Sequence, residues 1–102
     1  MNREPVWRAV ARDDLHDGIA WYGEQSARVT ERFIRVVDSV VEQILDNPHR
    51  FPFSIPGFRW AKVRGFPYQI HYAEVGNAVV IFAVWHEKRD REVLNRRLIV
   101  SR

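Results

Sequence analysis

The residues best suited to chemistry in this chain are four cations and a histidine in its second half. Lys62 and Arg64 lie on one side of a short β-prone run, and His86, Lys88 and Arg89 follow another such run. If the two runs are neighbouring strands, these side chains would converge. Cleavage of RNA through its 2′-hydroxyl needs a base, a cation for the phosphorane and an acid for the leaving oxygen. The set predicts either a nuclease site or a plain cationic surface that protects a strand edge.

Motifs for other chemistries do not occur. The histidines at positions 16, 49, 71 and 86 are scattered, so we expect no metal site, and His71 is a second candidate for moving the proton. The sequence contains no phosphate-binding glycine loop, no dinucleotide fingerprint and no HExxH or EF-hand spacing. No Ser/His/Asp set can be argued. We therefore expect a protein without a metal or other cofactor.

Three β-prone runs at residues 59–64, 68–74 and 78–85 must position the candidate residues. Gly76 and Asn77 tolerate positive φ, which predicts a hairpin between the last two runs. The second run alternates, with Tyr68, Ile70 and Tyr72 on one face, as in a half-buried strand. The third run, AVVIFAVW, is apolar throughout and indicates a central strand covered on both faces. We predict a three-stranded antiparallel sheet.

The segments around the sheet are expected to supply a strand, two helices and a basic tail. Residues 6–11 (VWRAVA) predict a fourth strand, and Asp13 and Asp14 predict the start of a helix over residues 14–24. A second helix, stopped by Asn47 and Pro48, is indicated by an apolar stripe at three- and four-residue steps. The stripe consists of Phe33, Val36, Val37, Val40, Val41, Ile44 and Leu45. Residues 49–58 are expected to form an ordered loop, and Asp90 to cap a short helix over residues 91–97.

Composition limits the class of protein. A chain of 102 residues with a hydrophobic fraction of 46% forms one globular domain, which we expect to span residues 1–102. The chain has no cysteine, which excludes disulfides and thiolate zinc sites and fits a reducing cytoplasm. No apolar run is long enough to span a bilayer, and the first residues lack a signal-peptide core. We therefore expect a cytoplasmic protein that does not contact a membrane.

Charge is divided unevenly along the chain. Residues 13–46 carry three Arg against eight Asp and Glu, whereas residues 47–102 carry ten Lys and Arg against four acids. A basic half beside an acidic half suggests a cationic face for an anionic partner, such as nucleic acid or an acidic protein. An unevenly charged solvated surface is the alternative.

The order of these elements resembles the RelE/ParE superfamily, the toxins of bacterial type II toxin–antitoxin modules, often named plasmid stabilisation proteins. The matching motifs are A-x-x-D-L at residues 11–15, A-W-Y at 20–22, F-P-Y-Q-I-H-Y at 66–72 and A-V-x-H-x-x-R at 83–89. The resemblance covers nearly the whole chain. It implies an α+β fold with an N-terminal strand, an α-helical hairpin, a three-stranded antiparallel sheet and a short basic C-terminal segment.

Within the superfamily the chain is closer to the ParE branch, which implies a toxin that targets DNA gyrase and is neutralised by a cognate antitoxin. One alternative is a RelE-type mRNA interferase, a metal-independent endoribonuclease that acts on the ribosome; another is a member that has lost toxicity and only binds its partner. By residue match, Lys62, Arg64 and either Lys88 or Arg89 would be the cations of the interferase, and His86 its acid. RelE-type members commonly use a C-terminal tyrosine, but no tyrosine follows Tyr72 here. The missing tyrosine favours the gyrase interpretation.

The resemblance and the basic residues together predict a partner-binding surface. The candidate binding residues are Arg59, Lys62, Arg64, Tyr72, His86, Arg89, Arg91, Arg96 and Arg97. We expect an antitoxin to bind through an extended or helical segment that carries apolar anchors and acids.

Overall fold

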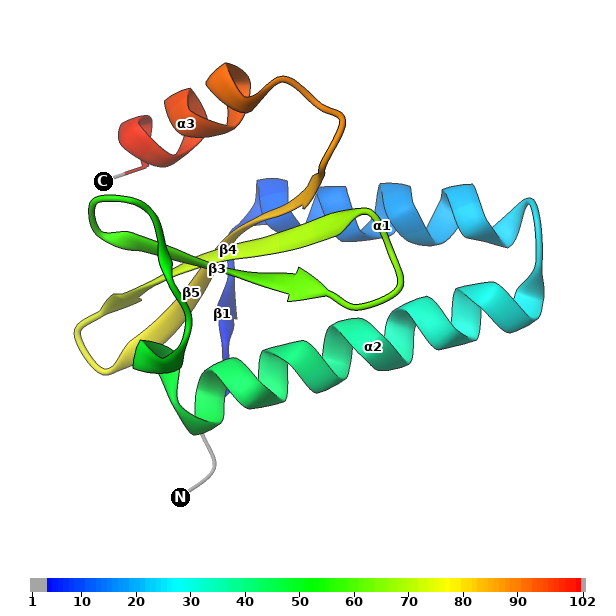
Figure 1. Cartoon of the computed structure of the whole chain (residues 1–102), viewed down its shortest axis with the longest axis horizontal. Coiled ribbons are helices and arrows are strands. Elements are labelled where there is room, and N and C mark those ends of the chain that lie inside the picture. Colours follow the sequence, from blue (N-terminus) through cyan, green and yellow to red (C-terminus); the bar gives the residue numbers. More distant parts are fainter. Residues whose placement is uncertain (1–3, 102) are drawn as a thin grey trace.

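The computed structural model describes residues 4–101 and places a long helical hairpin against a five-stranded sheet (Figure 1). The helices are α1 (Ala9–Gly23), α2 (Ala27–Asp46) and α3 (Arg91–Val100), with a single 3-10 turn, η1, at Pro48–Arg50. The strands are β1 (Val6–Trp7), β2 (Phe53–Ile55), β3 (Phe58–Val63), β4 (Tyr68–Val75) and β5 (Ala78–His86). The predicted α+β class is confirmed. Within the described part of the chain, no helix combines the length and hydropathy needed to cross a bilayer.

The sheet has the strand order β1-β5-β4-β3-β2. The three predicted strands, now β3, β4 and β5, form its antiparallel centre, and β1 lies parallel to β5 at one edge. The hairpin turn between β4 and β5 uses Gly76 at a φ of 61°, as the sequence predicts. Residues 49–58 were predicted to form an ordered loop, but part of this segment is a strand. The chain reverses at Gly57, and β2 pairs with β3.

The N-terminal segment differs from the prediction. The strand at residues 6–11 ends at Trp7, and α1 begins at Ala9 instead of near Asp14. Ala11, Asp14 and Gly18 lie at helical spacing and are all buried, so this segment gains more from packing one helix face than from extending the sheet. Asp14 consequently lies in the middle of α1 and does not cap it.

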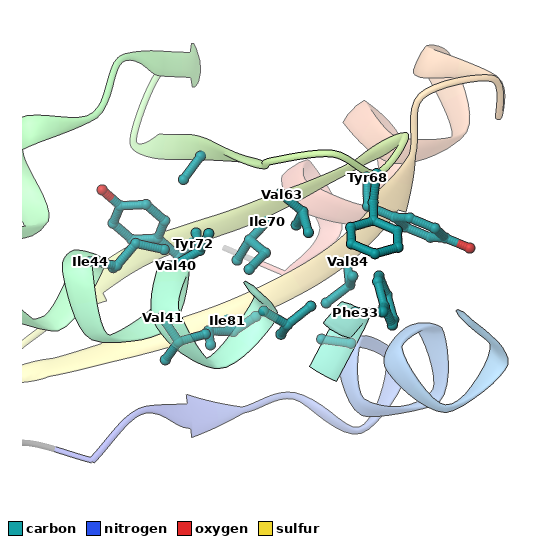
Figure 2. Packing of buried hydrophobic residues seen from close by; sticks show 14 of the residues in the cluster. Phe33, Val40, Val41, Ile44, Val63, Tyr68, Ile70, Tyr72, Ile81 and Val84 are labelled. Carbon is teal, nitrogen blue, oxygen red and sulfur yellow. The ribbon is translucent and has the colours of Figure 1, made fainter. Parts of the chain in front are cut away.

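One core lies between the hairpin and the sheet, and the predicted stripe of α2 forms much of it (Figure 2). Phe33, Val37, Val40, Val41 and Ile44 are buried and Val36 and Leu45 partly so, which confirms the predicted face of this helix. Each fully buried aliphatic side chain contributes roughly 1.5–3 kcal/mol, so this stripe holds the hairpin on the sheet.

A second core lies on the opposite face, where α3 packs against the sheet. Leu94 and Leu98 of α3 are fully buried among side chains of β3, β4 and β5, including Trp85. As predicted, Asp90 caps α3, accepting a hydrogen bond from the Glu92 N–H at 2.8 Å, although the helix continues to Val100. Because α3 covers this face, β4 is buried on both sides, and its predicted half-burial was wrong.

Candidate functional site

His86 ends β5 next to Tyr68, the first residue of β4. Their ring centroids are 5.0 Å apart, with the planes at 79°. Nδ1 of His86 accepts a hydrogen bond from the backbone N–H of Lys88 at 3.0 Å. In the neutral ring the proton therefore lies on Nε2, which can donate a hydrogen bond.

A cavity of about 310 Å³ lies beside this pair. It is lined by Asp14, Asp17, Tyr68, Val84, His86 and Arg89. Burial is the main cause that raises the pKa of the Tyr68 hydroxyl, and the nearby charges of Tyr22 and Asp17 raise it further, whereas Arg89 lowers it. Tyr68 is therefore a protonated phenol at neutral pH, so the cavity combines a histidine, a tyrosine and a cation.

Lys62 and Arg64 do not join this cluster. Nζ of Lys62 donates to the Phe66 carbonyl and to Glu87 Oε2, both at 2.7 Å, so its charge is paired. Arg64 is exposed directly after β3, where it lines a separate cavity of about 240 Å³ together with Arg50 and Lys62. Neither Lys62 nor Arg64 lines the cavity beside His86, so the structure does not show the convergence that the nuclease interpretation requires.

Arg89 and Arg97 both lie against the ring of Trp85 and share a buried carboxylate. Their guanidinium carbons are 3.9 and 5.1 Å from the Trp85 ring centroid. Arg97 makes a two-pronged pair with Asp14, at 2.6 and 3.2 Å, and Arg89 approaches Asp14 to 3.7 Å. The side chain of Asp14 is only 6% exposed, so the Asp14–Arg97 ion pair is internal to the fold. We did not predict it from the sequence.

Two predicted binding residues are parts of the framework. The Tyr72 side chain is fully buried and donates a hydrogen bond to the Pro48 carbonyl at 2.5 Å, and burial raises its pKa to about 12. A partner cannot reach it, so its predicted binding role was wrong. Arg59 donates to the Phe51 carbonyl at 2.7 Å and lies 3.9 Å from the Phe53 ring centroid, which holds the β2–β3 hairpin together.

The side chains of Lys88, Arg91 and Arg96 do not line the cavity beside His86. Arg91 donates to Asn95 and to Ser54 of β2, at 3.3 and 3.4 Å. Lys88 in the loop before α3 and Arg96 on α3 are exposed. These side chains form a scattered basic surface.

His71, the second candidate for proton transfer, is fully buried under α3. Burial, helped by the charge of Arg91, lowers its pKa from 6.5 to about 3. It therefore remains neutral and unavailable to a substrate at the surface. Among residues 4–101, no three His, Cys, Asp or Glu side chains are grouped so that they could hold a metal ion.

A hollow on the α3 side of the sheet, which we call the apolar trough, encloses about 570 Å³. Its floor consists of Phe58, Ala73, Val80 and Phe82. Its rim consists of Val6, Arg8, Pro56, Gly57, Glu74, Val75 and Ser101. Val6 and Val75 are about half exposed, so apolar surface continues from the floor onto the rim.

Comparison with known proteins identifies the family of this chain. Residues 6–91 match the sequence model described as the ParE toxin of the type II toxin-antitoxin system, parDE. The chain belongs to the ParE toxin family. A solved structure described as the chromosomal ParDE TA system from P. aeruginosa contains a chain of similar fold. The TM-score is 0.61 at 19% identity, over 81% of this chain and 94% of that one. No curated protein sequence matches this chain significantly.

Two features of this ParE family member escaped the sequence analysis. The floor of the apolar trough comes from three strands, and no spacing in the sequence shows that α3 leaves that part of the sheet open. The sequence did mark Asp14, which is the acid of the A-x-x-D-L motif, but we interpreted this residue as a helix cap. Its partners Val84 and Arg97 lie 70 and 83 residues away.

Proposed function

We propose that this ParE family member is the toxin of a type II toxin–antitoxin module that inhibits growth by targeting DNA gyrase and is neutralised by a cognate antitoxin. The observation that favours gyrase over message cleavage is the state of the candidate cations. Lys62 is paired with Glu87, and Arg89 lies 3.7 Å from the Asp14 carboxylate. A cation that is neutralised within the fold offers little to a phosphorane, which needs donors aimed at the developing charge.

A RelE-type endoribonuclease is the second candidate, and the cavity beside His86 favours it. As the acid, a doubly protonated His86 would give up one proton, the protonated Tyr68 adjoins it, and Arg89 lines the same cavity. Tyr68 would then supply a phenol to a chain that has no tyrosine after Tyr72. Against this candidate, Asp17 lines the cavity as well, and its charge repels a phosphate.

The proposed antitoxin contact is the apolar trough. Its floor suits apolar anchors of an extended or helical segment, which bury their area against the sheet. Glu74 on the rim pairs with His49, whereas Arg8, whose guanidinium lies 5.5 Å from the Phe82 ring centroid, makes no ion pair within residues 4–101. An acid beside the anchors would complement Arg8. Affinity should therefore fall moderately with salt, as this charged part is screened.

Controlled expression in a bacterium tests the choice of target, with message cleavage and gyrase-dependent DNA breaks scored separately. If gyrase is the target, His86→Gln leaves toxicity unchanged, and Arg64→Glu or Arg89→Glu lowers it as binding weakens. His16→Gln, on the exposed face of α1, is the matched control for the histidine change.

The nuclease candidate predicts the opposite pattern. His86→Gln abolishes cleavage because glutamine hydrogen-bonds but carries no transferable proton, and loss of Arg89 costs roughly 10²–10³ in rate. Purified protein that cuts ribosome-bound message, and loses this activity in a folded His86→Gln variant, would overturn the gyrase proposal.

A further inference from the structure

α3 begins at Arg91, the residue at which the match to the ParE family model ends. It lies on the face of the sheet that carries the apolar trough, and Ser101, directly after the helix, is part of the trough rim. The floor residue Phe82 and the α3-covered residue Trp85 belong to the same apolar cluster on β5. One continuous apolar strip is thus open at one end and covered by α3 at the other.

α3 is attached to the sheet by few contacts. Leu94 and Leu98 are its only fully buried side chains within the described residues, and its outer side exposes Val93, Ile99 and Val100. The remaining strong attachment is the Arg97 pair with Asp14. A helix of ten residues with two apolar anchors is marginal without such additional tertiary contacts.

Asp14 reaches α3 from the opposite side of the sheet. It belongs to α1, in the hairpin layer. Because β1 ends at Trp7, the part of β5 near Asp14 has no strand on its outer edge. The Val84 N–H at that open edge donates to Asp14 Oδ2 at 3.0 Å, and the same carboxylate accepts both terminal nitrogens of Arg97. One buried carboxylate therefore ties α1, the edge of β5 and α3 together.

We propose that α3 is an end wall of the antitoxin site in the apolar trough, held in position by Asp14 through Arg97, and that antitoxin binding and α3 docking stabilise each other. This proposal rests on the proposed function, which supplies the antitoxin as occupant. A segment that fills the trough meets the end of α3 at Ser101 and gains this contact only while α3 is docked. Coupling of this kind is reciprocal: a docked α3 raises antitoxin affinity, and bound antitoxin holds α3 down.

Hydrogen exchange of the full chain tests the role of Asp14. Asp14→Asn removes the charge that holds Arg97, and Arg97→Gln removes the same pair while keeping the Asp14 bond to Val84. Both should speed the exchange of α3 amides by about tenfold or more and leave β4 protected. Arg97→Lys, which keeps one charged contact, should restore protection in part. The control is Asp17→Asn, an exposed acid one turn further along α1.

The antitoxin half of the proposal is tested with the protein encoded by the small gene adjoining the toxin gene. Its affinity should fall by about tenfold in both Asp14→Asn and Arg97→Gln, by similar factors, and it should slow α3 exchange in the wild-type chain. The proposal is overturned if the variants free α3 but bind as tightly as wild type, or if they leave α3 exchange unchanged. A wild-type chain that binds no such protein would instead overturn the proposed function, together with the wall that depends on it.

Discussion

His71 should make folding stability depend on pH between neutrality and pH 5. It lies on β4 beneath α3, is fully buried and has a pKa of about 3, mainly because burial disfavours the charged ring. Its Nε2 is 3.0 Å from Gln69 Oε1, and its Nδ1 has no hydrogen-bond partner within the described residues. Protonation of Nδ1 would therefore create a buried, charged N–H group that has no hydrogen-bond acceptor.

The size of the effect follows from linkage. The pKa of His71 is lowered from 6.5 in the unfolded chain to about 3 in the fold. Between these values the unfolded chain binds more protons, so stability is complete above pH 6.5 and falls as pH drops toward 3. At pH 5 the loss is roughly 2 kcal/mol, from about 1.5 pKa units at 1.36 kcal/mol each. That is a large part of the ~5–15 kcal/mol typical of a small domain.

Urea unfolding at pH 7 and pH 5 measures the loss. His71→Gln keeps a polar side chain that does not titrate, so this variant, although less stable at pH 7, should lose about 2 kcal/mol less than wild type between the two pH values. His16→Gln should follow wild type, because His16 is exposed on α1. Equal losses in wild type and His71→Gln would refute the argument, since His71 would then titrate alike in the folded and unfolded chains.

Three substitutions test the packing of the hairpin. Val40→Asp buries an unpaired charge in the α2 stripe and should cost several kcal/mol, enough to prevent cooperative folding; a soluble, cooperatively folded variant would place the stripe on the wrong face. Tyr72→Phe leaves the Pro48 carbonyl unpaired and should cost about 1–3 kcal/mol in urea unfolding, so wild-type stability would argue against that hydrogen bond. Gly18→Leu should cost about 1–3 kcal/mol or more, because even a Cβ would lie 3.1 Å from the Phe33 ring; a rise in melting temperature would contradict this close approach.

The parts of the fold that were predictable are those set by local pattern. The α2 stripe repeats at helical spacing over more than three turns, and five of its seven members are buried. The run at residues 78–85 is apolar throughout, and β5 is covered on both faces. In both cases the signal lies within one element and does not depend on which neighbour covers it.

The errors arose where a distant segment decides the environment of a residue. The alternation at residues 68–72 is that of a half-buried strand, but α3 covers its second face and buries His71. α3 itself gives a weak signal, since only Leu94 and Leu98 are buried and both of its faces carry apolar side chains. Asp14 resembles a helix cap until the edge of β5 and Arg97, far along the chain, are placed beside it.

Catalytic cations must converge on one group, whereas cations that only attract a partner need not. Stabilising a transition state requires several donors within hydrogen-bond distance of one group. Attraction of a distant acidic or nucleic-acid partner depends on summed charge and needs no convergence. Three exposed cations make no ion pairs within residues 4–101: Arg64 directly after β3, Lys88 in the loop before α3, and Arg96 on α3. Lys62 and Arg97, by contrast, are paired. This distribution favours a toxin that binds its target over one that cuts it. Such dispersed charge acts mainly on the association rate, so added salt should slow association more than it speeds dissociation.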